Sequence, residues 1–147
     1  MSAVSKTIDK HLEEIKALAA ARTTSPTAWE LVGRHIKQRG WNSTDFDEYC
    51  LLDWGLYYKA MRGDSATPSL QTLMAICVGM NLTIPVTEEL LGAAGVKLSE
   101  AIPLHRAYMY IIEHMAGEPI SACNEFLNEL GINELGSQSY SGKQSAP

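Results

Sequence analysis

The sequence predicts an all-α protein, with a core of five helices between an N-terminal helix and a C-terminal helical hairpin. Two observations lead to this fold class. Apolar side chains recur at helical spacing in most segments, and glycines, prolines and capping residues separate those segments. No segment alternates convincingly with the period of a strand, and no internal repeat is visible. With 147 residues, 46% of them hydrophobic and 20% charged, the chain can bury a core of its own.

The first predicted helix covers residues 7–22. Four apolar residues follow one another at spacings of four, three and four and form one stripe, along which this helix can pack; they are Ile8, Leu12, Ile15 and Ala19. Pro26 then suits the first turn of a helix. Thr27 and Glu30 have the spacing of a capping box, which predicts a second helix from about Thr27 to Arg39 that stops at Gly40.

Two short helices are predicted next. Ser43 or Thr44 can cap a helix that runs to about Cys50. Asp53 can cap another, over Trp54–Arg62, which Gly63 ends. After a loop, Ser69 opens a helix whose apolar residues lie at offsets of three, four and seven, namely Leu73, Ile76, Cys77 and Met80. The fifth core helix contains EELLGAA, with Pro85 and Thr87 before it and Gly95 closing it.

The last two helices are expected to pack as a hairpin on the earlier ones. Their apolar residues are Leu104, Tyr108, Ile111, Ile112 and Met115 in one, and Cys123, Phe126, Leu127 and Leu130 behind a Ser121 cap in the other. From Gly136 onward the chain is polar and rich in Ser and Gly, which predicts a flexible tail. The expected divisions are an N-terminal helix and linker (1–26), a central domain (27–95), a packed helical extension (96–135) and the tail (136–147).

Cysteine usage indicates a reducing compartment, because three cysteines stand apart among apolar residues, which suggests buried thiols; they are Cys50, Cys77 and Cys123. The sequence before the first helix lacks the apolar core of a secretory signal, and no window approaches a membrane span. We therefore expect a cytoplasmic protein without a membrane partner.

The segment Gly40–Leu82 resembles the Cro-like, XRE-type helix-turn-helix family of phage repressors and bacterial regulators. The most telling match is PSLQTLMAICVGMNL, residues 68–82, which is similar to the fourth helix of that family. More narrowly, DFDEYCLLDWGLYYKAMRG resembles a little-characterised bacterial branch with a paired Leu at the turn. That branch often continues into a helical extension like HRAYMYIIEHMAGEPISACNEFLNELG. The resemblance covers about 55 residues, from Thr27 to Leu82.

The resemblance implies double-stranded DNA as the partner and transcription regulation as the function. A recognition helix in this family presents one face to base edges, while the start of the preceding helix holds phosphates. Carried over by position, the DNA-facing residues are Trp54, Gly55, Tyr58 and Lys59, with Tyr57 and Ala60 facing the core. The phosphate-holding positions are Asn42, Ser43 and Thr44, and Arg62 is placed for a contact with the DNA backbone.

The chain departs from the family pattern in three ways. Asp47 stands where a small residue is usual, and a carboxylate there needs a partner or a water. Leu51 stands where many members have Gly in a left-handed turn. Gly55 and Trp54 cannot form the bidentate pairs by which Arg, Asn or Gln discriminate bases.

The charge pattern keeps a second hypothesis open. The net charge is −5, and residues 88–134 carry two basic against eight acidic side chains, whereas residues 27–87 carry five against six. The five basic residues cluster within the motif, which favours DNA; they are Arg34, Lys37, Arg39, Lys59 and Arg62. Net acidity and a Trp in place of a polar reader favour the alternative, a protein-binding module (adaptor, antitoxin-like partner or inhibitor from a mobile element) that uses Trp54 and Tyr58 or the acidic C-terminal helices.

Catalytic, metal and cofactor sites are not expected. The sequence lacks HExxH, Gly-rich phosphate-loop, GxSxG and paired CxxC motifs. His105, His114 and Cys123 match no standard zinc spacing and have structural explanations on helices. A homodimer is a further expectation, through either the helix near residues 7–22 or the C-terminal hairpin, and the sequence does not choose between them.

Overall fold

The computed structural model describes residues 3–23 and 25–136, and for residues 3–7, 19–23 and Trp54 it describes the backbone alone. Within these residues the only regular elements are helices, with no strand, which confirms the predicted all-α class. The helices are α1 (Ala3–Thr23), α2 (Ala28–Arg39), α3 (Ser43–Cys50), α4 (Trp54–Met61), α5 (Leu70–Gly79), α6 (Ile84–Ala93), α7 (Pro103–His114) and α8 (Ile120–Glu129).

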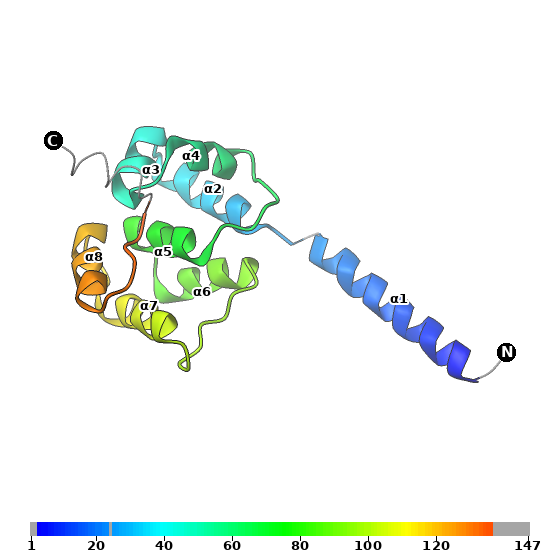
Figure 1. Cartoon of the computed structure of the whole chain (residues 1–147). Helices are drawn as coiled ribbons and strands as arrows, with labels where there is room; N and C mark the ends of the chain where they lie inside the picture. Colours follow the sequence, from blue (N-terminus) through cyan, green and yellow to red (C-terminus); the bar gives the residue numbers. More distant parts are fainter. Residues whose placement is uncertain (1–2, 24, 137–147) are drawn as a thin grey trace.

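Helices α2 to α8 share one hydrophobic core, and α1 stands outside it (Figure 1). Trp29 on α2, Phe46 on α3 and Tyr108 on α7 are among the largest fully buried side chains. α5 lies between the α2–α4 group and the α7–α8 pair. The core therefore unites residues of the predicted central domain and of the predicted extension. All three cysteines are buried and free, as the sequence predicts.

The residues that cap the helix starts agree with the prediction at two helices and differ from it at two others. Thr27 and Glu30 form the predicted capping box of α2, and Ser69 caps α5 by accepting from the Thr72 N–H. α3 is capped by Asn42 rather than by Ser43 or Thr44, and Asp53 at the N-cap of α4 makes no side-chain cap bond. The chain enters each helix in an extended conformation, and the first residue that can reach back to the N–H groups of the opening turn caps it.

Two later helices begin earlier than predicted. α6 starts at Ile84 with Thr83 as its cap, so Pro85 lies inside the first turn, where its missing N–H costs nothing. α8 starts at Ile120 after Pro119, and the predicted cap Ser121 lies within the helix. α1 begins at Ala3, before the predicted residue 7. The existence and order of these helices are as predicted, and their bounds differ by a few residues.

The C-terminal segment 130–136 returns from α8 across α5 to the turn between α3 and α4 (Figure 1). Leu135 is 1% exposed, and the buried Asn124 side chain accepts from the Leu135 N–H at 2.7 Å and donates to its carbonyl oxygen at 3.2 Å. A Cβ at Gly136 would lie 2.7 Å from the Leu51 backbone oxygen. Gly136, the first residue of the predicted tail, is thus held against the body; residues 137–147 lie outside the described residues.

Candidate nucleic-acid interface

The candidate site is built on two eight-residue helices, α3 and α4, joined by three residues. Leu51 ends α3 in the left-handed conformation, with φ of 53°, which a β-carbon disfavours and which glycine usually supplies. Leu52 follows and is buried in the core. The Phe46 and Tyr57 rings lie 6.2 Å apart and fix the two helices against each other. The paired Leu noted in the sequence therefore forms the turn between α3 and α4, and its second residue holds this turn against the core.

α4 presents a polar and aromatic face outward. Tyr58 is 48% exposed and Arg62 is exposed, while Gly55 and Lys59 are partly covered. Ala60 is buried, as the resemblance implies. Tyr57 is half-buried and packs against the core, with its ring edge on the Tyr58 ring. The Trp54 side chain lies outside the described residues, so its expected position on this face stays a prediction.

The start of α3 combines Asn42, Ser43 and Thr44. Asn42 accepts from the Asp45 N–H at 2.9 Å, and the Asp45 carboxylate accepts from the Asn42 N–H at 3.1 Å, which makes a capping box. These two N–H groups therefore have acceptors within the chain. The N–H groups of Ser43 and Thr44, in the first turn, have no intrahelical partner and point out of the helix start. Asn42 acts here chiefly as a cap, beside two positions that can still donate to an anion.

A groove of about 440 Å³ runs between α2 and the end of α4. Three basic side chains line it, Arg34 and Lys37 from α2 and Arg62 after α4. Glu30 also lines it, and its carboxylate accepts from the Thr27 N–H at 3.1 Å. Positive charge from two helices thus converges on one open groove next to the exposed face of α4.

Asp64 is the carboxylate that balances Arg62. The Arg62 Nη2 lies 2.9 Å from the Asp64 Oδ2, and Asp64 also accepts from the Ala66 N–H. The Ala66 N–H and then Arg62 lower the pKa of Asp64 below its ordinary value. Since this ion pair is exposed, it holds the guanidinium in place while leaving it in solvent, where a second anion can reach it.

Close contact between α2 and α4 forms the floor of this groove. A Cβ at Gly33 would lie 2.3 Å from the Ala60 carbonyl oxygen, a distance that no side chain tolerates. Glycine at position 33 therefore lets the two backbones approach and sets the separation of Arg34 and Lys37 from Arg62. Arg34 and Lys37 were grouped with the basic residues of the motif from the sequence, but only the packing of α2 on α4 assigns them to one site with Arg62.

The outer side of α3 is acidic and aromatic instead. The Trp41 and Tyr49 rings stack at 5.1 Å, with the Arg39 guanidinium 5.2 Å from the Trp41 ring. Trp41 is half-buried against the core, and Tyr49 is 54% exposed. Asp47 keeps a buried Oδ1 that has no hydrogen-bond partner among the described residues. Burial, and then the charge of Asp53, raise the pKa of Asp47.

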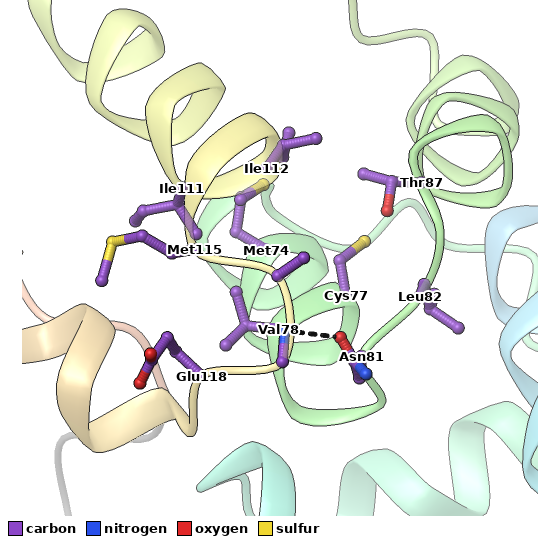
Figure 2. Close-up of a pocket in the computed structure, with 12 residues that line it drawn as sticks. Met74, Cys77, Val78, Asn81, Leu82, Thr87, Ile111, Ile112, Met115 and Glu118 are labelled. Carbon is purple, nitrogen blue, oxygen red and sulfur yellow. Dashed lines mark hydrogen bonds between the residues drawn. The ribbon is translucent and has the colours of Figure 1, made fainter.

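The contact between α5 and the α7–α8 connection encloses a cavity of only about 30 Å³ (Figure 2). The Asn81 side chain accepts from the Gly117 N–H at 2.9 Å across it. Burial raises the pKa of the Cys77 thiol beside it to about 12. A space of this size accommodates about one water molecule, so this contact is structural. Because its pKa is raised, the Cys77 thiol stays protonated at neutral pH.

His105 and His114 contact neighbouring residues of the chain, and Cys123 is buried. His105 accepts from the Ser99 N–H at 3.0 Å, and the His114 ring lies 4.7 Å from the Tyr110 ring. Among the residues that the structure describes, no group of three or more His, Cys, Asp or Glu could hold a metal ion. In the same part of the chain, no helix has the length and apolar character that crossing a membrane requires.

Comparison with known proteins gives no match: no family model, no curated protein and no solved structure is similar to the chain. The residues expected to face DNA are therefore judged by their geometry. Tyr58 and Lys59 lie on α4, and Arg62 directly follows that helix. Ser43 and Thr44 lie at the start of the helix before it, and Arg34 and Lys37 join Arg62 in the groove.

Proposed function

We propose that the chain binds double-stranded DNA as a helix-turn-helix regulator, with α4 as the recognition helix. The resemblance of residues 40–82 to the XRE-type family supports this function, as do the two eight-residue helices and the turn between them. The observation that carries it is the groove lined by Arg34, Lys37 and Arg62 beside the exposed face of α4. Phosphate contacts supply most of the affinity of such proteins, and this groove gathers cations where a DNA strand would pass.

Tyr58 and the backbone surface at Gly55 would then contact the base edges in a groove of the DNA duplex. A tyrosine hydroxyl can donate to and accept from base edges, but it does not distinguish bases as an Arg or Asn does. Specificity therefore depends on few direct contacts, and the cations of the α2–α4 groove account for most of the affinity. A regulator of this kind binds many sequences with similar strength.

A protein-binding role for the same fold is the second candidate, and one observation favours it. Tyr49, stacked on Trp41, presents an exposed aromatic surface beside the carboxylates of α3. Exposed aromatic pairs are typical anchors of protein interfaces. The sequence adds Trp54 and the acidic C-terminal helices to the surfaces that such a partner could use.

The proposed function is tested by titrating a short, labelled, mixed-sequence duplex at low salt. The variant Arg34→Ala/Lys37→Ala removes two groove cations, and Lys97→Ala/Arg106→Ala removes two exposed cations on the α6–α7 side as the matched control. Each lost charged contact to phosphate should weaken binding by about tenfold. The groove variant should therefore bind far more weakly, and the control should bind like the original chain.

Equal loss of affinity in both variants would mean that general charge, and not the groove, attracts the duplex. Absence of duplex binding by the original chain at low salt would refute the DNA function. In that case a partner recovered from cells, and lost with Tyr49→Ala but kept with Tyr110→Ala, an exposed tyrosine of α7, would establish the protein-binding role.

A further inference from the structure

Helix α1 carries an apolar stripe that no other described part of the chain covers. Its large apolar side chains are between 48% and 66% exposed; they are Ile8, Leu12, Ile15 and Leu18. Every described side chain from residue 8 to residue 18 is exposed, and Figure 1 shows α1 outside the body formed by α2–α8. Isolated helices are marginally stable in water and gain stability by covering such a face. The stripe therefore needs a partner.

The stripe has the spacing of a coiled-coil seam. Ile8, Leu12 and Ile15 are separated by four and three residues, which places them at alternating core positions of a heptad. α1 has 21 residues, so it is about 30 Å long and offers this seam along a large part of its length. A second helix with the same seam would cover the apolar side chains from both sides.

The charges beside the seam identify that second helix. Asp9 follows Ile8 and Lys16 follows Ile15, so the two occupy the same heptad position with opposite signs. If two copies of α1 pair antiparallel, Leu12 of one meets Ile15 of the other, and Asp9 of each lies opposite Lys16 of the other. In a parallel pair, Lys16 would instead face His11 of the second copy, without an opposite charge. The pattern is self-complementary only in the antiparallel arrangement.

We propose that α1 is a self-association helix, which pairs antiparallel with α1 of a second copy of the chain. The apolar seam supplies the affinity, because exposed ion pairs contribute little, and the two Asp9–Lys16 pairs set the orientation. Such a pair closes with two-fold symmetry and leaves the body of each copy, including the α2–α4 groove, outside the interface. The proposal is independent of what that groove binds.

Sedimentation equilibrium of the full chain over a wide range of protein concentration tests the association. The original chain should form a dimer, and Leu12→Glu should weaken dimerisation by at least a hundredfold, because it introduces a carboxylate into the seam. Ala17→Glu adds the same carboxylate to α1 away from the seam and should leave the dimer intact. A monomer at all concentrations, or a Leu12→Glu variant that still dimerises, would overturn the proposal.

The orientation is tested by exchanging the two charges. Asp9→Lys and Lys16→Asp should each weaken the dimer several-fold, because each brings like charges together. The double variant should restore it, since the pairs between copies are formed again with reversed signs. A double variant that is weaker than both single variants would overturn the antiparallel arrangement. Thermal melts of all variants should coincide, because the described side chains of α1, residues 8–18, are exposed and lie outside the core of the body.

Protection of α1 in a monomer, measured by hydrogen exchange, is the remaining outcome. It would mean that α1 covers its own body, for which the apolar groove of about 380 Å³ between α6 and α7 offers the place; Ile84, Leu91 and Leu98 line it. That result would overturn association with a second copy.

Discussion

The α2–α4 and α7–α8 regions contribute to one core, but their surfaces differ in charge. In the first region, Gly33 allows two helices to meet closely, and the groove above that contact gathers Arg34, Lys37 and Arg62. In the second, segment 130–136 is hydrogen-bonded to α8, and the exposed acidic side chains of the two helices are Glu113, Glu125 and Glu129. The net charge of −5 is the sum over all residues of the chain and does not show this difference. The local distribution of charge, which the packing creates, therefore says more about a partner than the total does.

The largest expected effect concerns the segment that ties the two regions together. Leu135→Ala removes a fully buried side chain and should lower the free energy of unfolding by about 3 kcal/mol. Urea unfolding measures this loss. Leu130→Ala, five residues earlier and half exposed, is the control and should change the free energy of unfolding by less than about 0.5 kcal/mol. Equal stability of the two variants would mean that the returning segment is not part of the core.

The next effect separates the close helix contact from the groove that it supports. Gly33→Ala places a methyl group against the Ala60 carbonyl and should cost about 2 kcal/mol, since α2 or α4 must shift. Gly92→Ala is the matched change, because no atom lies within 4 Å of its added Cβ, and should gain up to about 1 kcal/mol. Thermal unfolding compares them. Duplex affinity that survives in a destabilised Gly33→Ala chain would argue against a role for the α2–α4 separation.

A smaller effect is expected at Asp47, where a buried carboxylate oxygen has no hydrogen-bond partner among the residues that the structure describes. Asp47→Ala should raise the free energy of unfolding by about 1 kcal/mol at pH 7. The raised pKa of Asp47 means that the folded chain holds its proton more tightly than the unfolded chain does. The destabilisation is therefore present above the raised pKa and disappears below the ordinary value of 3.8, so the advantage of the variant should shrink as the pH falls.

Urea unfolding at pH 7 and at pH 3 measures this dependence. Glu48→Ala on the exposed side of the same helix is the control and should alter stability little at either pH. An Asp47→Ala chain that is less stable than the original at pH 7 would mean that the carboxylate has found a stabilising contact.

The sequence predicts the helices well because their signals are local. The capping box of Thr27 and Glu30 and the cap at Ser69 need only residues of the same turn, and both are confirmed. The predicted cap was wrong where several neighbouring residues can serve, as at Asn42 and Ser43. The direction in which the chain enters the helix decides which of them caps it. The left-handed turn at Leu51 was foreseen only from the family position, since leucine itself gives no signal for it.

The site and the returning segment depend on contacts between distant residues. Arg34 and Arg62 are separated by two helices in the sequence, and only the Gly33–Ala60 approach brings their side chains to one groove. Segment 130–136 has no regular structure, so the pairing of Asn124 with Leu135 leaves no periodic pattern to read. The apolar stripe of α1 shows the reverse case. It predicts the helix correctly, but it does not predict that the stripe stays exposed among the described residues.

The proposed function is tested most directly by the salt dependence of duplex binding. Each phosphate that a cation neutralises contributes a slope of about −0.9 to the plot of log affinity against log salt concentration. The three groove cations Arg34, Lys37 and Arg62 predict a slope of about −2.7 or steeper for the original chain. Lys37→Ala should make it shallower by about 0.9, and Lys97→Ala should leave it unchanged. A slope that is the same for all three chains, or no binding at low salt, would contradict the account.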